Sequence, residues 1–321
     1  MKAFSTRHRD LWQSLGVLLA LLIAAAIVSP RDLRTGQPLF LTTDNLTNML
    51  RVTAPVAIVA LGMTFVILTA GIDLSVGSIL GLSAVVCALS LARWHLGAGV
   101  SVALAVAAGG LAGLLNGSLV ALLRVQPFII TLASMIGLRG LTRSLCNNEN
   151  IGLRTAGDEA VRFVDTFSQK PVMIGLFVAL AILAAAVLRV TVFGRYIRAL
   201  GDNATASLYA GLPVKPVLVA VYTITGLLAG LAGVLTAART TTGNPNDGIA
   251  AELDVIAVVV MGGTSLAGGR GGIAGTVIGA LIICILANIL GLRNVDANAQ
   301  LMIKAGIIVI AVVLQKVRAT R

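Results

Sequence analysis

The chain has 321 residues, of which 57% are hydrophobic and only 12% are charged. A soluble domain uses about 25% charged residues, so this composition excludes a soluble globular protein. The formal net charge of +11 does not indicate a nucleic-acid partner. Its Lys and Arg residues stand singly at the ends of apolar runs, where snorkelling and the positive-inside rule place them.

The apolar residues form blocks of roughly 17 to 25 without the alternation of porin strands, which predicts membrane-spanning helices. We expect an all-α, polytopic membrane helical bundle of about ten transmembrane helices in a single domain over residues 1–321. The expected spans are Trp12–Ser29, Val52–Ala70, Leu74–Ala92, Val100–Leu123, Phe128–Leu145, Val172–Val190, Val217–Ala238, Val255–Leu266, Ile273–Leu292 and Ala299–Gln315. The eighth is too short to cross unaided and is predicted to be a broken or re-entrant helix.

Three cysteines (Cys87, Cys146 and Cys284) lack the spacing of a disulfide framework or a metal site. The first apolar run has no clean small-residue cleavage pattern after it, so we interpret it as a retained helix rather than a signal peptide. An even number of spans places both termini on one side. Basic residues are slightly more frequent in the connections that then face inward, which predicts cytoplasmic N- and C-termini. This orientation puts residues 194–216 in the cytoplasm and makes residues 146–171 the largest external loop.

The connection Gly194–Pro216 carries the signals of a short helix between two membrane-length runs. Asn203 is a good N-cap, Gly211 supplies a residue that tolerates positive φ, and Pro213 prevents continuation. A helix of about two turns is marginal in water by itself, so it needs a bed on this protein or the groove of a partner. In an arbitrary membrane protein, a surface loop with one capped turn is the commoner explanation.

Glycine is abundant and its spacing is informative. Small-xxx-small stripes occur at Gly109, Gly113 and Gly117, at Gly226 and Gly230, and at Gly275 and Gly279. Such stripes let helix backbones approach closely in lipid, so they predict a tightly packed bundle.

An ionisable residue, Asp73, stands between two apolar runs in the stretch Ala70–Gly77. A charge at membrane depth is expensive and by default is a functional hypothesis. Asp73 and Ser75 also stand where they can cap the following helix, while Gly71 permits a sharp turn. We favour the cap and keep a role in substrate passage as the alternative.

The glycines of Gly262–Gly272 suggest a phosphate loop, but their spacing contradicts it. After Gly263-x-x-x-x-Gly268 comes Gly269 rather than Lys, and no Ser or Thr follows as a metal ligand. We expect a tight re-entrant turn instead, and no nucleotide hydrolysis by this chain.

Four stretches in order resemble the ribose-type sugar permeases of bacterial ABC importers. They are GMTFVILTAGIDLSVGSILGL (Gly62–Leu82), QPFIITLASMIGLRGLTRSL (Gln126–Leu145), GRYIRALGDNATASLYAGL (Gly194–Leu212) and ELDVIAVVVMGGTSLAGGRGGIAGTVIGAL (Glu252–Leu281). The resemblance implies a type II ABC importer-like permease of the bacterial inner membrane, which carries a monosaccharide by alternating access. It also implies a second permease copy (identical or a paralogue), a cytoplasmic ABC ATPase and a periplasmic sugar-binding protein. The chain itself is then no enzyme and holds no cofactor, because ATP and Mg are bound by the ATPase.

The resemblance assigns the short cytoplasmic helix to a cleft of the ATPase, where it transmits closure to the bundle. The candidate coupling residues are Asn203, Ala204, Leu208, Tyr209, Gly211, Arg195 and Arg198. A passage for a polyol needs small, weakly polar side chains, and the candidates are Thr64, Thr69, Asp73, Asn116, Thr131, Thr264, Ser265 and Asn288. Candidates for docking the binding protein are the external arginines Arg31, Arg34, Arg154 and Arg162.

Other functions stay open at this point. The same architecture could carry nucleosides, branched-chain amino acids or another small polar solute. A secondary transporter needs embedded ion or proton sites, and the sequence offers only Asp73, Arg139 and Lys304 without an evident paired relay. An intramembrane enzyme would need a catalytic pair, but His8 and His95 are both peripheral in the sequence pattern.

Overall fold

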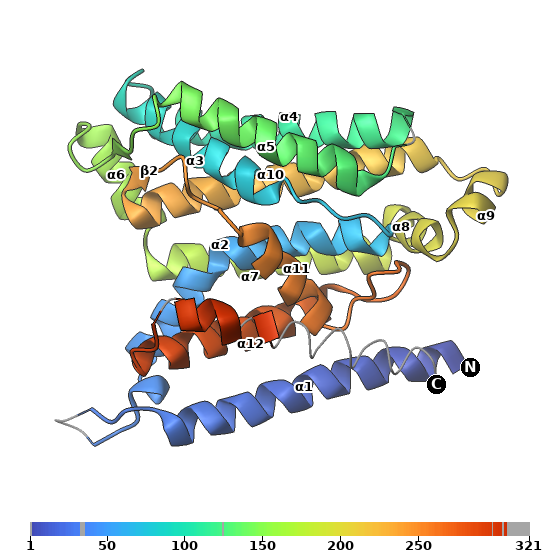
Figure 1. Ribbon diagram of the computed structural model, residues 1–321, viewed down its shortest axis with the longest axis horizontal. Coiled ribbons are helices and arrows are strands. Elements are labelled where there is room, and N and C mark those ends of the chain that lie inside the picture. The colour runs from blue at the N-terminus through green and yellow to red at the C-terminus, as the bar shows by residue number, and fades with distance from the viewer. Residues whose placement is uncertain (1, 33–35, 124, 297, 304, 307–321) are drawn as a thin grey trace.

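The computed structural model describes residues 2–32, 36–123, 125–296, 298–303 and 305–306. Long helices lie side by side along one direction, and a short two-stranded sheet lies at one end of the bundle (Figure 1). The longer elements are α1 (Lys2–Val28), α2 (Thr43–Leu68), α3 (Val76–Ala92), α4 (Ala98–Leu123), α5 (Pro127–Leu145), α7 (Lys170–Val190), α10 (Val214–Thr240) and α12 (Ile273–Leu292). The shorter ones are η1 (Leu39–Leu41), β1 (Ile151–Gly152), α6 (Asp158–Phe167), α8 (Val192–Asp202), α9 (Ala204–Tyr209), β2 (Thr242–Gly243) and α11 (Ala251–Met261).

Most of the expected spans are helices. Among the described residues, six helices (α2, α4, α5, α7, α10 and α12) are long and apolar enough to cross a membrane. Two further spans are 17-residue apolar helices, the Trp12–Val28 part of α1 and α3. The expected span Val255–Leu266 ends at Met261 as the 11-residue α11, in line with its prediction as a broken helix. Ala299–Gln315 lies largely outside the described residues, so an expected count of about ten is not confirmed.

The glycine stripes pack helices against each other as predicted. A β-carbon at Gly109 would lie 2.8 Å from the Cα of Gly230, and one at Gly113 would lie 3.0 Å from the Cα of Gly226. The stripes of α4 and α10 therefore face each other, backbone against backbone. The third stripe, on α12, faces α11, because a β-carbon at Gly279 would lie 2.9 Å from the backbone nitrogen of Gly262.

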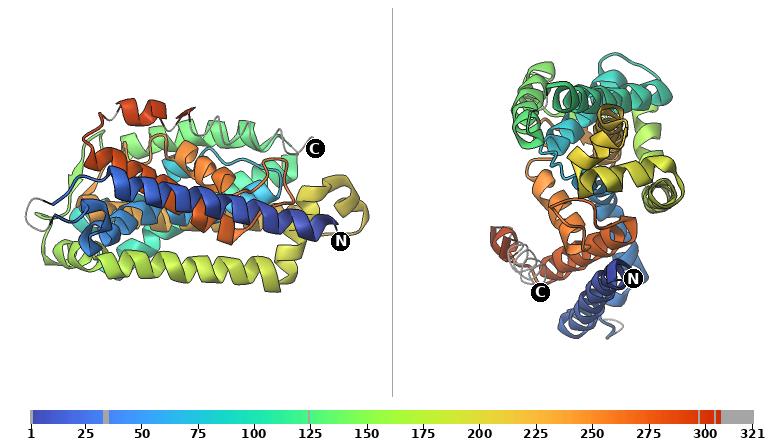
Figure 2. Two further views of the ribbon diagram at one scale, coloured as in Figure 1. Left: turned by 90° about the horizontal axis from the view of Figure 1, so that it is seen from below. Right: turned by 90° about the vertical axis from the view of Figure 1, so that its right-hand side faces the viewer.

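The core lies between α2, α3 and α10, whose middle turns are almost wholly buried. Helix α1 is peripheral and packs mainly against α12, on the side of the molecule opposite α4 and α5 (Figures 1 and 2). Helices α4, α5 and α7 keep exposed apolar faces that lipid can cover.

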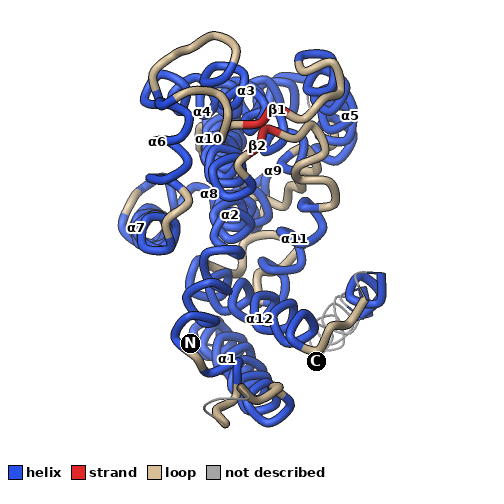
Figure 3. Tube along the Cα trace, turned by 90° about the vertical axis from the view of Figure 1, so that its left-hand side faces the viewer, coloured by secondary structure: helices blue, strands red, loops and turns tan. Residues whose placement is uncertain are grey.

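The two ends of the bundle carry different structures. Strands β1 and β2 pair antiparallel, and with α6 they cover one end (Figures 1 and 3). Helices α8 and α9, the loop 262–272 and the start of α1 lie at the other end. The loop 146–171 and the connection 194–216 therefore lie at opposite ends, and the first turn of α1 shares the end of 194–216.

Two crossings are interrupted near the middle of the bundle. After α2, residues 69–75 run back into the bundle before α3 begins, and residues 244–250 run inward from β2 before α11 begins (Figure 1). We call these the first interruption and the second interruption. They lead to one crossing point, where the backbones of Gly77 and Gly248 touch. A β-carbon on either glycine would overlap the carbonyl oxygen of the other. Broken helices of this kind are tolerated at membrane depth only where protein or a cavity surrounds them.

Candidate functional site

Helix α9 forms where the sequence predicts it. The Asn203 side chain accepts a hydrogen bond from the backbone N–H of Ala206 at 2.9 Å, which is an N-cap bond. Gly211 has φ +77°, and the chain re-enters helix only at Val214, directly after Pro213. The predicted capped helix of about two turns is confirmed, although α9 itself spans only Ala204–Tyr209.

Helix α9 has little support from its own chain. Its contacts are mainly with its neighbours α8 and α10, and Ser207 is the one buried residue within its bounds. Leu208 and Tyr209 are exposed, with Tyr209 at 87%. Ala204 and Arg195 are exposed as well. A six-residue helix that presents apolar side chains to water is suited to the groove of a partner.

Helix α8, which the sequence did not indicate, fastens this region to the bundle. Thr191 caps it, and Ile197 and Leu200 are buried in the main core. Its last turn meets two other segments at Gly201. A β-carbon there would overlap the carbonyl oxygen of Leu68, and it would lie 2.5 Å from the backbone nitrogen of Gly269. We call this meeting of α8, the end of α2 and the loop 262–272 the α8 junction.

Hydrogen bonds tie the α8 junction together. The backbone N–H of Gly269 donates to the carbonyl of Leu68 at 3.0 Å, and Arg198 Nη1 donates to the carbonyl of Gly271 at 3.0 Å. Arg198, a candidate for contact with the ATPase, thus binds this protein's own loop, whereas Arg195 on the same helix points to solvent.

The loop 262–272 is the tight turn that its glycines predict. Gly263, Gly268, Gly269 and Gly271 all have positive φ. The loop closes on itself because the N–H of Ser265 donates to the carbonyl of Arg270 at 2.9 Å. Thr264 is fully buried and packs against Gly271.

Asp73 lies in the first interruption and is fully buried. Its Oδ1 accepts from both the backbone N–H (2.9 Å) and the hydroxyl (2.6 Å) of Ser75, and Asn116 Nδ2 donates to the Ser75 hydroxyl at 2.8 Å. The carboxylate therefore organises the turn that leads into α3. Neither it nor Ser75 bonds to the first turn of α3 as a side-chain cap, so the predicted cap is wrong in that detail.

The remaining pathway candidates lie between packed segments. Thr64 shares a 2.6 Å hydrogen bond with Thr276 of α12, and Asn288 exchanges amide hydrogen bonds with Asn45. Thr131 donates to the carbonyl of Ile72 at 3.2 Å, and Thr69 donates to the carbonyl of Val66 at 2.7 Å. Asp73, Asn116 and Thr131 lie together around the first interruption, which also contains Thr69. The other candidates stand on other segments, namely Thr64 on α2, Thr264 and Ser265 in the loop 262–272, and Asn288 on α12.

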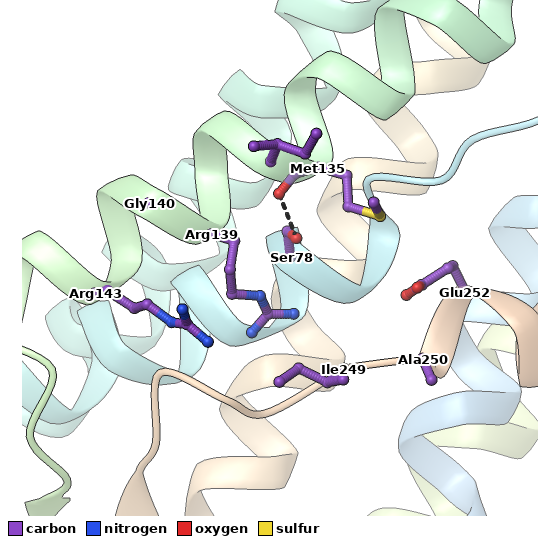
Figure 4. Close-up of a pocket in the computed structure, with 9 residues that line it drawn as sticks. Ser78, Met135, Arg139, Gly140, Arg143, Ile249, Ala250 and Glu252 are labelled. Atoms are coloured by element: carbon purple, nitrogen blue, oxygen red, sulfur yellow. Dashed lines mark hydrogen bonds between the residues drawn. The ribbon is translucent and has the colours of Figure 1, made fainter.

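A cavity of about 400 Å³ lies where the two interruptions meet, and none of the pathway candidates lines it. Its lining comes from α3, α5, the second interruption and α11, as Figure 4 shows. The lining residues are Ser78, Met135, Ile136, Arg139, Gly140, Arg143, Ile249, Ala250 and Glu252. Arg139 was visible in the sequence as a charge within an apolar run, but nothing there indicated which residues it meets.

The docking candidates lie at the end of the bundle with α6 and β1–β2. Arg154 pairs with Asp165 (4.0 Å) and Arg162 with Glu159 (3.3 Å). Both ion pairs are exposed, and each contributes little to stability. The two arginines could therefore pair with carboxylates of a partner instead. Arg31 is exposed and pairs its backbone with Pro38, while Arg34 lies outside the described residues.

The described residues contain no group of His, Cys, Asp and Glu that could hold a metal ion. These features define the class of the protein as a multi-pass helical membrane protein, with a short exposed helix at one end and a cavity between its helices. The chain belongs to the family described as "Branched-chain amino acid transport system / permease component", which it matches over residues 45–312.

Three relatives of this chain are named for the sugar that they transport. The chain is 44% identical over 304 residues to the ribose import permease protein RbsC of Escherichia coli (strain K12), covering 92% of each chain. It is 41% identical to the RbsC of Bacillus subtilis (strain 168), covering 95% of this chain and 93% of the relative. It is 35% identical to the D-allose transport system permease protein AlsC of Escherichia coli (strain K12), covering 95% of this chain and 92% of the relative. No solved structure matches the chain.

Proposed function

We propose that this chain is the membrane permease subunit of an ABC importer that carries a ribose-like monosaccharide across the bacterial inner membrane. The observation that carries the proposal is the exposed, capped helix α9 on a chain that is 40% or more identical to ribose import permeases over most of its length. The family description mentions amino acids, whereas the three relatives reported above are named for sugars, so a sugar is the preferred cargo.

The end of the bundle that carries α8 and α9 is the cytoplasmic end in this proposal, and both termini are cytoplasmic. The ATPase holds α9 in a cleft and binds ATP and Mg itself. ATP has no differential contact with this chain, so its effect must pass through α9 and the α8 junction. Leu208 and Tyr209 are the natural anchors, because exposed apolar and aromatic side chains dominate interface energetics.

The opposite end, with α6 and β1–β2, receives the periplasmic sugar-binding protein. Its exposed ion pairs supply charge that steers docking more than it strengthens binding. A second permease copy completes the translocation unit, and the sugar passes by alternating access without covalent chemistry.

Reconstitution tests this proposal. Proteoliposomes are prepared with the chain, its ATPase and a ribose-binding protein. They are expected to accumulate ribose only when ATP is present on the side of the membrane that carries the ATPase. Vesicles with the chain alone should show no uphill uptake. Accumulation of ribose by the isolated chain, with or without a proton gradient, would contradict the proposal and would favour a secondary transporter.

A further inference from the structure

The lining of the cavity at the crossing of the two interruptions includes three charged side chains, Arg139 and Arg143 of α5 and Glu252 of α11. Arg143 Nη2 donates to Asn246 Oδ1 at 3.0 Å, which leaves Arg139 and Glu252 as the two charges on opposite walls. Arg139 extends from α5, Glu252 extends from the first turn of α11, and their side chains point toward each other across the cavity (Figure 4). The two groups attract each other electrostatically, but no ion pair joins them among the described residues. Charged side chains at membrane depth are rare and expensive, so this arrangement requires an explanation beyond packing.

Part of Arg139 has a structural task. Its Nη1 donates to the carbonyls of Pro245 and Asp247, each at 2.7 Å, and so fastens the second interruption to α5. Both hydrogen bonds use one nitrogen. Nε and Nη2 have no protein partner among the described residues, and Arg139 is one of the residues that line the cavity.

Glu252 has no comparable structural bond to another segment within the described chain. Its carboxylate lies beside Gly77 near the start of α3, where a side chain would overlap Glu252 Oε2. Gly77 therefore keeps space open for the carboxylate as well as for the close approach of Gly248. An acceptor that faces a donor across open space is suited to a ligand with adjacent hydroxyl groups.

The rest of the lining fits the same class of ligand. Met135, Ile136, Ile249 and Ala250 are apolar and can cover the C–H face of a sugar ring. The Ser78 hydroxyl donates to the carbonyl of Met135 at 2.8 Å and keeps its acceptor positions. A volume of about 400 Å³ is at the small end of small-molecule sites and suits one monosaccharide.

We infer that this cavity is a transient binding site for the transported sugar, in which Arg139 donates hydrogen bonds to two neighbouring hydroxyl groups and Glu252 accepts one from the other side. The site takes a neutral polyol of monosaccharide size. The inference rests on the proposed function, since it names where such a cargo is held during passage.

The test is equilibrium binding of radiolabelled ribose to the purified importer, permease with ATPase, in lipid nanodiscs and without the sugar-binding protein. Glu252→Gln and Arg139→Lys are each expected to weaken ribose binding about tenfold to a hundredfold, as expected for the loss of charge-assisted hydrogen bonds. Asp254→Asn is the matched control. It makes the same kind of change, carboxylate to amide, on the same helix at a residue that does not line the cavity. Its charge acts on Glu252 only through space, so this variant should lose much less ribose affinity than Glu252→Gln does.

Monodeoxyriboses separate direct contact from a structural effect. The analogue that lacks the hydroxyl bound by Glu252 should bind the wild type about tenfold more weakly than ribose does, and it should lose nothing further in Glu252→Gln. A merely structural role would weaken all analogues equally. That pattern, or ribose binding unchanged in both Glu252→Gln and Arg139→Lys, overturns the inference.

Ribose uptake by the wild-type importer in proteoliposomes is measured in parallel. ATP-driven uptake together with unchanged binding in the variants would reject the cavity assignment and leave the proposed function standing. Absence of ATP-driven uptake of any monosaccharide would reject the proposed function itself. If Glu252→Gln does not assemble, Arg139→Lys with the deoxy series decides the question alone.

Discussion

Two short helices follow each other in the same connection, and they differ in how they are held. Helix α8 buries Ile197 and Leu200 in the main core and presses Gly201 against the end of α2. Helix α9 exposes Leu208 and Tyr209 and contacts mainly its chain neighbours.

In the proposed importer, this difference separates two tasks that one helix could not perform together, namely binding the ATPase and passing its movement to the bundle. A segment that a partner must grip has to be accessible, so it cannot also be packed in the core. A segment that transmits movement has to be rigidly connected to what it moves. Packed cores and close backbone contacts are not continuously deformable, and for that reason a shift of α8 would be passed to its neighbours. Through the α8 junction those neighbours are the end of α2, which leads into the first interruption, and the loop that follows α11.

The largest effect is expected at the α8 junction itself. Gly201→Val places a side chain where the carbonyl of Leu68 lies, and backbone atoms cannot move aside as a flexible side chain can. Overpacking of this kind costs about 1–3 kcal/mol or more. We expect the junction to open and ribose uptake to be abolished, while α9 still binds the ATPase.

The measurement combines ATP-driven ribose uptake in proteoliposomes with co-purification of the ATPase. Gly175→Val is the matched control, because a β-carbon at Gly175 of α7 would meet nothing within 4 Å. Normal uptake by Gly201→Val would show that α8 does not transmit the movement.

The next largest effect concerns the grip on α9. Leu208→Glu combined with Tyr209→Ala removes the two exposed anchors, and we expect the affinity for the ATPase to fall at least about tenfold. The unfolding temperature of the permease alone should stay unchanged, because neither side chain is packed. Trp94→Ala is the control, because Trp94 is an exposed aromatic just after the end of α3, next to Arg93, which pairs with Glu149 of the loop 146–171. Undiminished co-purification of the ATPase with the double variant would place the grip elsewhere.

The contrast between α8 and α9 also explains what the sequence could predict. Helix α9 depends on local chemistry, with Asn203 as its cap, Gly211 at positive φ and Pro213 after it. These residues are close together in the sequence, so the sequence predicts the helix directly. Helix α8 contains two glycines, and tertiary contact through Ile197 and Leu200 stabilises it, so the local sequence gives only a weak signal.

The same distinction between local and tertiary signals explains why the spans could be predicted and the cavity could not. Glycine stripes and apolar runs predicted the long helices, because lipid imposes length and packing rules on each helix separately. The two interruptions meet through Gly77 and Gly248, which are far apart in the chain and have no local signature of each other. Arg139 was a visible charge, yet its partners are backbone carbonyls more than 100 positions away, and a carbonyl has no sequence signal.

A smaller effect is expected from the bond that connects α8 to the loop 262–272. Arg198→Gln removes a charge-assisted hydrogen bond to the carbonyl of Gly271, worth about 1.5–3 kcal/mol where it is shielded from water and less here, because Arg198 is only half-buried. We expect partial uncoupling, seen as less ribose transported per ATP hydrolysed, with ATPase binding retained. Arg195→Gln is the matched control on the same helix, since Arg195 is exposed. Should the Arg195 variant lose more coupling than the Arg198 variant, the assignment of the two arginines would have to be reversed.

The smallest effect is expected at the cap of α9. Asn203→Ala removes the acceptor for the N–H of Ala206, a change that costs about 1 kcal/mol at helix N-termini. A six-residue helix has little other stability, so the loss should appear as a partly unfolded α9 that must fold on binding, with about fivefold weaker affinity for the ATPase. Asn203→Ser keeps a capping acceptor and should bind nearly as the wild type does. Because the α8 junction is untouched, each ATPase that still binds the alanine variant should drive transport with unchanged efficiency. A loss of transport per bound ATPase in that variant would mean that gripping and transmission are not separate tasks of α9 and α8.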